Sequence, residues 1–311
     1  MEILSLFLKT YNKDFARAKK LVESVKKHNT EEIPIWIACP KKDLNYFKIL
    51  ETESWINCIN EESIPVKLAQ IETNGISPGY LNQEVLKLGF SELDLSEHYF
   101  CLDSDGLFLN DFSKKDFLTN AGVPKLALIE DKDLQIDNLY YKRHWIVRQQ
   151  YLNKIAKIMV SEDDETILKT CHNFQLFTNS YLKKFKIEIL EKNQWGYLDS
   201  ILYSPYEFSW YNYFVQSRKL PHVQVEPYFK MIHSLEEFVS MKISGVDSLS
   251  ISRAYMGVVV NSNFSQSDEI LEIDSSLEKV LGNYLSLRSI ALLVTNKLRN
   301  VLKNRLLRKK S

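Results

Sequence analysis

The chain has 311 residues, enough for one large α/β domain with an appendage or for two domains. With 45% hydrophobic and 12% aromatic residues it can bury an ordinary core, which excludes a disordered chain. The 40 basic and 40 acidic side chains sum to zero, but nine of the basic ones follow Glu278 and no acidic residue does. We therefore expect a distinct role for this basic end.

The cysteines and the start of the chain indicate a cytoplasmic protein. No two of the four cysteines have the Cys-x-x-Cys spacing, and Cys39 and Cys101 lie in apolar runs, so we expect buried free thiols in a reducing compartment. The first residues lack a basic segment followed by a long apolar one, so no signal peptide is expected. No uncharged apolar run reaches the roughly 18 residues of a membrane-spanning helix.

The first 40 residues are predicted to form a strand–helix–strand unit. Residues 3–8 and 33–39 are apolar runs typical of buried strands, and the apolar positions of residues 15–25 recur at helical spacing. Such βαβ units bind ligands at the carboxyl ends of their strands. Thr10, Tyr11 and Asp14 fall at that end, where they are either ligand contacts or simply a capped helix start.

Residues 79–90 form a predicted helix with three polar side chains on one face. Tyr80, Gln83 and Lys87 are three or four residues apart, so they lie one above the other on the helix surface. Lys87 is placed to neutralise a bound diphosphate, or it is an ordinary solvated lysine.

The stretch 98–112 carries the clearest chemical signal. Its first apolar run ends in Asp103 and Asp105, which alternation along an extended backbone sends to the same side. Two carboxylates so close resist joint ionisation unless a cation lies between them. Oxygen ligands suit Mg²⁺ or Mn²⁺, ions that also bind substrate phosphates. The stretch therefore predicts a metal–diphosphate site, although Asp-x-Asp also occurs in plain turns.

Two enzyme families place Asp-x-Asp at the end of a strand, and Asp-Ser-Asp-Gly at 103–106 resembles both. In GT-A glycosyltransferases the motif holds a divalent ion on the diphosphate of a nucleotide sugar. In haloacid-dehalogenase-like phosphatases it carries a nucleophilic aspartate and an acid, but it usually opens the domain, whereas about a hundred residues precede it here. The GT-A resemblance is therefore favoured, and it implies that Thr10, Tyr11 and Asp14 contact the base and ribose.

A longer pattern makes the resemblance more specific. Gly-Tyr-x-x-Gln-x-x-x-Lys-Leu at 79–88, followed by Leu-Asp-Ser-Asp at 102–105, is similar to a group of bacterial GT-A-like proteins from surface-polysaccharide (capsule and lipopolysaccharide) gene clusters. The resemblance implies an α/β GT-A fold over residues 1–245, with a Rossmann-like, mostly parallel sheet flanked by helices. It also implies a nucleotide-sugar donor, contacted by Tyr80, Gln83 and Lys87, and a glycan or lipid-linked oligosaccharide acceptor.

Two segments in the middle of the chain can each be interpreted in two ways. Residues 126–129 are a predicted buried strand, and residues 140–159 are a predicted helix rich in aromatic and basic side chains, including Arg148. These side chains line an acceptor groove or form an ordinary helix wall. The acidic cluster at 162–165 is the first turn of a helix or, in a phosphatase, a second metal-binding motif.

Three residues are candidates for catalysis. The resembling group tends to have a histidine motif where His172 stands at the head of an apolar run; the alternative is a core histidine. Asp199 and Glu207 are the only acids of the aromatic segment 194–214 and thus the local candidates for a catalytic base. Related sequences often read Ser-Glu-Tyr-Glu near here, whereas this chain reads Ser-Trp-Tyr-Asn at 209–212, so both acids are missing there.

A third metal ligand is expected from a late strand. Residues 223–238 are predicted to contain a strand, a short turn and His233. Many GT-A enzymes close their metal site with a histidine from such a strand, and imidazole can complete a shell begun by two carboxylates. The resemblance therefore implies that His233 joins Asp103 and Asp105.

Residues 246–311 are predicted to be a helical extension that is basic and amphipathic. Apolar residues from Leu287 to Leu302 recur at i, i+3, i+4 and i+7, and the basic residues lie largely on other faces. Such a helix suits the surface of an anionic membrane, although it can also pack on the body or on a partner. Nucleic acid is the least favoured partner, because no stacking aromatic residue follows Tyr284 and no nucleic-acid motif is recognised.

The sequence thus predicts a glycosyltransferase that uses Mn²⁺ or Mg²⁺ and is peripheral on the inner face of the cytoplasmic membrane. The metal and nearby cations would stabilise the charge that develops on the departing nucleotide diphosphate. The alternatives are the phosphatase and a non-catalytic, membrane-bound scaffold.

The basic end gives a first testable prediction. Truncation after Glu278 removes nine positive charges and no negative one. Each basic residue near an anionic leaflet contributes about 1 kcal/mol before screening. The full chain is therefore expected to sediment with anionic liposomes at low salt and to be released as salt rises, whereas the truncated chain stays in the supernatant. Failure of the full chain to sediment at low salt, or unfolding of the truncated body, would contradict the membrane role.

Overall fold

The computed structural model describes residues 1–128, 144, 146–160, 168–171, 174–261 and 273–275. Three predictions lie outside these residues: His172, the acidic cluster at 162–165 and the basic helix after Glu278. They remain predictions.

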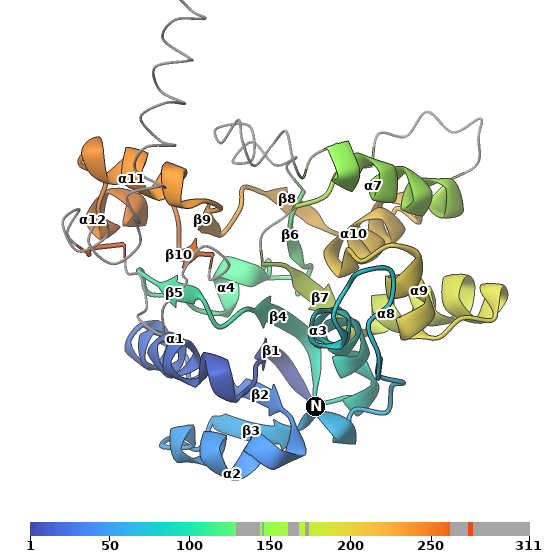
Figure 1. Cartoon of the computed structure of the whole chain (residues 1–311), viewed down its shortest axis with the longest axis horizontal. Helices are drawn as coiled ribbons and strands as arrows, with labels where there is room; N and C mark the ends of the chain where they lie inside the picture. The colour runs from blue at the N-terminus through green and yellow to red at the C-terminus, as the bar shows by residue number, and fades with distance from the viewer. Residues whose placement is uncertain (129–143, 145, 161–167, 172–173, 262–272, 276–311) are drawn as a thin grey trace, which may run out of the picture.

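A five-stranded sheet forms the centre of the molecule, in the order β3-β2-β1-β4-β7 (Figure 1). Strands β1 to β4 are parallel and β7, at the edge, is antiparallel to β4. Their bounds are β1 (Glu2–Lys9), β2 (Ile35–Cys39), β3 (Ile56–Asn60), β4 (Ser96–Leu102) and β7 (Leu176–Thr178). Because both faces are covered, the inner strands are nearly continuous apolar runs. The predicted α/β class with a mostly parallel sheet is confirmed.

Helices cover this sheet because their apolar residues recur on one face. In α1 (Phe15–His28) the buried positions are Ala18, Leu21, Val22 and Val25, which form a single stripe. The helix predicted near 79–90 is α3 (Pro78–Gly89), and it begins with proline in its first turn after Ser77, whose Oγ accepts the backbone N–H of Tyr80. The other described α-helices have these bounds: α2 (Leu44–Phe47), α4 (Lys114–Phe117), α7 (Ile146–Met159), α8 (Asn179–Phe185), α9 (Tyr197–Tyr203), α10 (Glu207–Ser217), α11 (Leu235–Ile243) and α12 (Ser248–Ser252).

Two smaller sheets complete the described body. One has the order β5-β10-β9 and the other pairs β6 with β8. Their bounds are β5 (Gly106–Phe108), β6 (Lys125–Ala127), β8 (Val223–Val225), β9 (Phe229–Ile232) and β10 (Gly257–Val260). Since β10 pairs with both β5 and β9, the α/β body continues past the boundary expected at residue 245, at least to the end of β10.

The sheet order creates a crevice at one place. From β1 the chain goes to β2 and β3 on one side and returns to β4 on the other, so β1 and β4 are neighbours at a topological switch point. In open α/β sheets, ligands bind outside the carboxyl ends of the strands at this point. Thr10 follows β1 and Asp103 follows β4, so two predicted ligand segments meet there.

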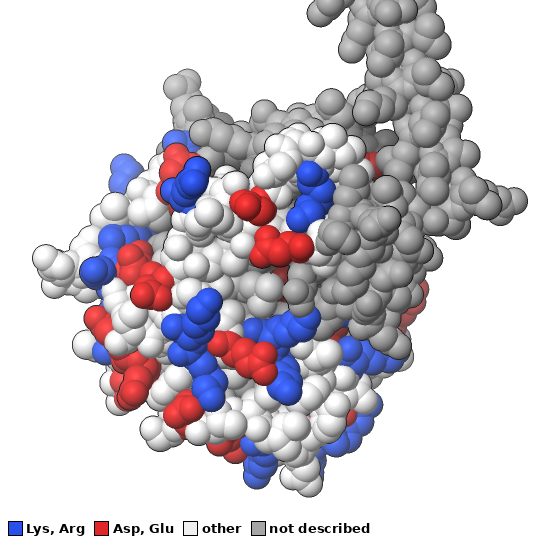
Figure 2. Space-filling model, turned by 90° about the vertical axis from the view of Figure 1, so that its left-hand side faces the viewer, with Lys and Arg blue, Asp and Glu red and all other residues white. Residues whose placement is uncertain are grey.

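The described surface has no single dominant charge on the face shown in Figure 2, where acidic and basic side chains are interspersed. Within the described residues, no helix combines the length and apolar composition needed to cross a bilayer.

The contact between β10 and its neighbours gives a second prediction. A Cβ added to Gly257 would overlap the ring of Phe229 and the backbone oxygen of Leu107. Gly257→Ala is therefore expected to lower the free energy of unfolding by about 1–3 kcal/mol, the usual cost of overpacking. Urea unfolding measures the change. The control is Gly79→Ala in α3, where an added Cβ meets nothing within 4 Å; equal losses in both variants would contradict the packing argument.

Candidate functional site

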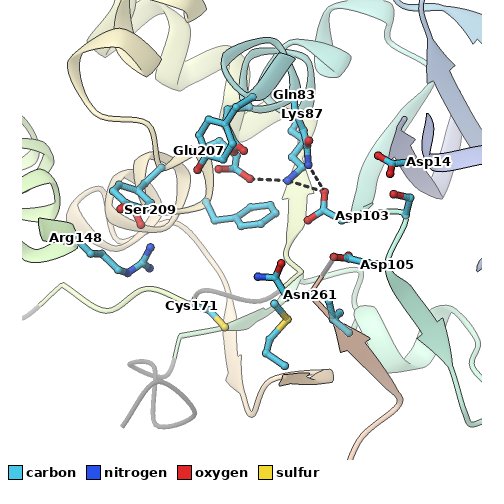
Figure 3. Close-up of a pocket in the computed structure, with 17 residues that line it drawn as sticks. Asp14, Gln83, Lys87, Asp103, Asp105, Arg148, Cys171, Glu207, Ser209 and Asn261 are labelled. Carbon is cyan, nitrogen blue, oxygen red and sulfur yellow. Dashed lines mark hydrogen bonds and ion pairs between the residues drawn. The ribbon is translucent and has the colours of Figure 1, made fainter. Parts of the chain in front are cut away.

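A cavity of about 270 Å³ opens at the switch point (Figure 3). Its lining comes from α3, the turn after β4, the start of α10 and the end of β10. Seven predicted site residues line it: Asp14, Tyr80, Gln83, Lys87, Asp103, Asp105 and Glu207. Arg148, expected to line an acceptor groove or to belong to an ordinary helix wall, lines it as well. Residues 120 positions apart in the chain are therefore brought to one place.

The two aspartates stand on the tight turn between β4 and β5. The backbone N–H of Gly106 donates to the carbonyl of Asp103 over 3.1 Å, and the carbonyl of Asp105 accepts the N–H of Val260 over 3.3 Å. A side chain at Gly106 would meet the ring of Phe174, since an added Cβ would lie 2.7 Å from that ring. Glycine thus lets the turn pass under Phe174, and both carboxylates reach the cavity as predicted.

Lys87 forms ion pairs with two acids of the site. Its ammonium lies 3.0 Å from Asp103 Oδ1 and 3.0 Å from Glu207 Oε1, and the residue is only 2% exposed. Burial alone would lower the pKa of Lys87, but the adjacent Asp103 and Glu207 carboxylates raise it well above the ordinary value, so the ammonium stays charged. Gln83 also donates to Asp103 Oδ1, over 2.6 Å. The predicted diphosphate contact is therefore a buried counter-ion of two acids in this structure.

A second acid, Glu84, lies beside Glu207. Burial raises the pKa of Glu84 well above its ordinary value, and the neighbouring Glu207 raises it further, so Glu84 is held in its neutral form. Burial would also raise the pKa of Glu207, but Lys87 and a hydrogen bond from Glu84 lower it below the ordinary value. One carboxyl group of the pair thus keeps a proton while the other is ionised.

Only some of the residues expected to contact a nucleotide line the cavity. Asp14 lines the cavity and pairs with Arg17 over 3.1 Å, and burial raises its pKa. Tyr80 lines the cavity and donates its hydroxyl to the carbonyl of Pro205 over 3.5 Å. Thr10, which is buried, and Tyr11, which is 42% exposed, are not among the lining residues.

Two further candidates lie elsewhere. Asp199 is exposed and accepts the backbone N–H of Gly196 over 2.8 Å, so it caps α9 and does not line the cavity. His233 follows β9, is buried, and donates its backbone N–H to Glu237 over 2.9 Å. It does not line the cavity either. The local chain order was compatible with a place for both at the site, but the packing of their elements leaves neither of them in the cavity lining.

The lining residues suit a divalent cation only in part. Across the described residues, no three His, Cys, Asp or Glu side chains are close enough to hold a metal ion, so His233 does not complete a cluster with Asp103 and Asp105. Mg²⁺ and Mn²⁺ do not require such a cage, because they keep several waters and bind one or two carboxylates together with substrate phosphates. The hard oxygen donors of Asp103 and Asp105 fit an ion of this kind.

Sequence reasoning missed Glu84 and Tyr206, which also line the cavity. A signal for both was present. Glu84 is four residues from Tyr80 and three from Lys87, so it shares their helix face. The segment 204–207 reads Ser-Pro-Tyr-Glu, which matches three residues of the Ser-Glu-Tyr-Glu pattern sought at 209–212. Its final residue is Glu207, the acid already named as a candidate base.

Comparison with known proteins places the chain in a family. A family model described as a family of unknown function, DUF6492, matches residues 2–241. The chain belongs to this family. The DUF6492 match includes all seven predicted residues that line the cavity and ends before β10.

Similarity beyond DUF6492 is confined to structure. No curated protein sequence matches the chain. Among solved structures, mouse xyloside xylosyltransferase 1 in its apo form is similar, with a TM-score of 0.47 and 12% sequence identity, over 85% of this chain and 99% of that chain.

The neutral Glu84 gives a third prediction. Its folded pKa is raised above the unfolded value of about 4.3, so above that pH the native state holds a proton that the unfolded state has released. The free energy of unfolding should therefore fall as pH rises above that value, by up to about 1.4 kcal/mol per pH unit, until Glu84 ionises in the native state. Glu84→Gln, which is neutral at every pH, should remove this slope in urea unfolding. The control is the exposed Glu72→Gln; an unchanged slope in Glu84→Gln would show that Glu84 is ionised.

Proposed function

We propose that this protein is a metal-dependent glycosyltransferase that moves a sugar from a nucleotide-sugar donor to a hydroxyl group of an acceptor. The observation that carries the proposal is the position of Asp103 and Asp105. They line a cavity at the switch point of a mostly parallel sheet, directly after β4 and beside the end of β1. Nucleotides bind at such points, and carboxylates there can receive the cation of a diphosphate.

In this proposal Asp103 and Asp105 hold Mn²⁺ or Mg²⁺. When bound, such an ion supplies positive charge to the diphosphate as it departs. Lys87 orients Asp103, since its ammonium is 3.0 Å from the Oδ1 atom. Gln83 fixes the same oxygen from the next turn of α3. Both side chains therefore prepare the Asp103 carboxylate before any ligand arrives.

Glu207 is the proposed base for the acceptor hydroxyl. Lys87 and Glu84 lower its pKa, so it is ionised at neutral pH, and it lines the cavity on the other side of Lys87 from Asp103. In the reaction the bond between the sugar and the diphosphate breaks, the bond to the acceptor oxygen forms, and the acceptor proton moves to the Glu207 carboxylate.

The acceptor and the location of the reaction rest on the sequence. The resemblance to surface-polysaccharide enzymes favours a glycan or lipid-linked oligosaccharide. The nine basic residues after Glu278 favour an anionic membrane surface on its cytoplasmic side, where a lipid-linked acceptor would lie.

The fourth prediction tests the metal-binding carboxylates. Asp103→Asn and Asp105→Asn should each abolish the rise in melting temperature that a nucleotide sugar plus Mn²⁺ causes in the wild-type protein, because each removes one of the two carboxylate ligands. A panel of uridine, guanosine, cytidine and thymidine diphosphate sugars is measured with and without Mn²⁺. The control is Asp111→Asn, whose side chain is 72% exposed and pairs with His28.

Two outcomes would contradict the proposal. Turnover of a generic phosphate ester, or a phosphoenzyme mimic trapped on Asp103 with beryllium fluoride, would assign the haloacid-dehalogenase-like chemistry instead. Absence of any nucleotide-sugar binding by the wild-type protein would favour the non-catalytic scaffold.

A further inference from the structure

A row of four buried polar side chains ends at the wall of the cavity. Ser209 lines the cavity and is only 1% exposed, and its Oγ lies 3.0 Å from Thr170 Oγ1. Asn212, three residues after Ser209 on the same face of α10, places its Nδ2 3.5 Å from Thr170 Oγ1. Gln175, directly before β7, donates its Nε2 to Asn212 Oδ1 over 2.9 Å. Thr170, Asn212 and Gln175 are buried as well.

The backbone fixes the orientation of the Gln175 amide. Its Oε1 accepts the N–H of Ala127 over 3.3 Å and that of Leu176 over 3.1 Å, and its Nε2 donates to the carbonyl of Ala127 over 3.0 Å. A backbone N–H only donates and a carbonyl only accepts, so the amide fits one way round. Its Nε2 therefore faces the oxygen of Asn212, which leaves the Asn212 Nδ2 group directed at Thr170.

This direction continues through Thr170 to Ser209. The amide Nδ2 of Asn212 is a donor without acceptor capacity, so the Thr170 proton cannot be donated to it. In the part of the chain that the structure describes, Ser209 Oγ is the other hydrogen-bond partner of the Thr170 hydroxyl. A buried hydroxyl proton without an acceptor costs free energy, so Thr170 donates its proton to Ser209 Oγ.

The proton of Ser209 itself remains available for a ligand. Several helical serines of this protein donate their proton to the carbonyl three residues before, namely Ser24, Ser200 and Ser217. For Ser209 the described residues offer no such acceptor, since its side-chain hydrogen bond is the one with Thr170. Because that bond is already filled by the Thr170 proton, the Ser209 proton is directed elsewhere, and its side chain borders the cavity.

The place of Ser209 in the cavity indicates which part of a substrate it meets. Figure 3 shows it on the side of Glu207, across the cavity from Asp103 and Asp105. A nucleotide diphosphate belongs with the cation at the two aspartates, so the saccharide is the part that reaches Ser209. Hydroxyl, ring and acetamido oxygens of saccharides all accept hydrogen bonds.

We propose that Ser209 donates a hydrogen bond to an uncharged oxygen of a bound saccharide, either the sugar of the nucleotide sugar or the acceptor. In this proposal Thr170, Asn212 and Gln175 are positioning residues, because they reserve the Ser209 proton for the ligand. The inference rests on the proposed glycosyltransferase function and adds a determinant of sugar binding to it. A substrate group that can only donate, such as an ammonium, would be disfavoured at this place.

The experiment separates binding of the sugar from binding of the nucleotide. In the nucleotide-sugar arm, UDP-glucose, UDP-N-acetylglucosamine and GDP-mannose are each compared by calorimetry with UDP or GDP alone, all with Mn²⁺. In the acceptor arm, the methyl glycosides of the same three sugars are titrated in the presence of UDP and Mn²⁺ and followed by ligand-observed NMR. The arm that responds to the variants identifies which saccharide Ser209 contacts.

Ser209→Ala should lower the sugar-dependent affinity about 3- to 10-fold in at least one arm, the usual effect of one neutral hydrogen bond. The affinity for UDP or GDP alone should stay within about twofold, because the nucleotide does not reach this side. The control is Ser217→Ala on the same helix, whose hydroxyl donates to the carbonyl of Phe214 over 3.0 Å and which is not among the lining residues.

Thr170→Val and Thr170→Ser test the positioning role. Thr170→Val keeps the shape of the side chain but removes the proton that fixes Ser209, so it should lose part of the same sugar-dependent affinity. Thr170→Ser keeps the hydroxyl and should retain that affinity. A merely structural role would lower the melting temperature of Thr170→Val and leave its sugar-dependent affinity unchanged.

Two results would overturn the inference while nucleotide sugars bind: full sugar-dependent affinity of folded Ser209→Ala in both arms, or an equal loss of affinity for UDP or GDP alone. If Ser209→Ala does not fold, the comparison of Thr170→Val with Thr170→Ser decides, and equal sugar-dependent affinities would overturn it. Failure of every nucleotide sugar to bind the wild-type protein would overturn the proposed function, and the inference with it.

Discussion

The site depends on one buried ammonium. Lys87, from the last turn of α3, pairs with Asp103 after β4 and with Glu207 at the start of α10. Glu207 lies 120 residues from Lys87 in the chain, and without the lysine the buried Glu207 and the partly exposed Asp103 would lose their shared counter-ion. Breaking a buried pair of this kind costs about 3–5 kcal/mol, which is a large fraction of the stability of a domain. The geometry of the carboxylates is therefore coupled to the packing of α3 on α10.

The contact with Lys87 also gives two neighbouring acids, Glu207 and Glu84, different protonation states. Glu207 is ionised because Lys87 is beside it, while Glu84, one helical turn before Lys87, retains its proton because burial and Glu207 oppose its ionisation. Such separation of two neighbouring carboxyl groups is common where proteins perform acid–base chemistry.

Local patterns in the sequence were sufficient for the α/β class and for several residues of the cavity lining. The strands that flank α1 are short apolar runs, and a run of that kind is buried whatever its neighbours are. Tyr80, Gln83 and Lys87 were found because helical spacing alone puts them on one face. Asp103 and Asp105 were found because alternation in an extended segment is equally local.

Contacts between distant segments decided the rest. The residues near Asp199 in the chain do not show whether its side chain caps α9 or lines a cavity. The tertiary packing of α9 decides this, because it leaves Asp199 exposed at the start of the helix. His233 directly follows β9, and its position relative to the cavity depends on how β9 pairs with β10. The sequence by itself determined which residue types stand at the ends of strands and on the faces of helices, because those depend on neighbours three or four positions away. Only the tertiary structure decided that Lys87 meets Glu207, because that contact spans 120 residues and depends on how whole elements pack.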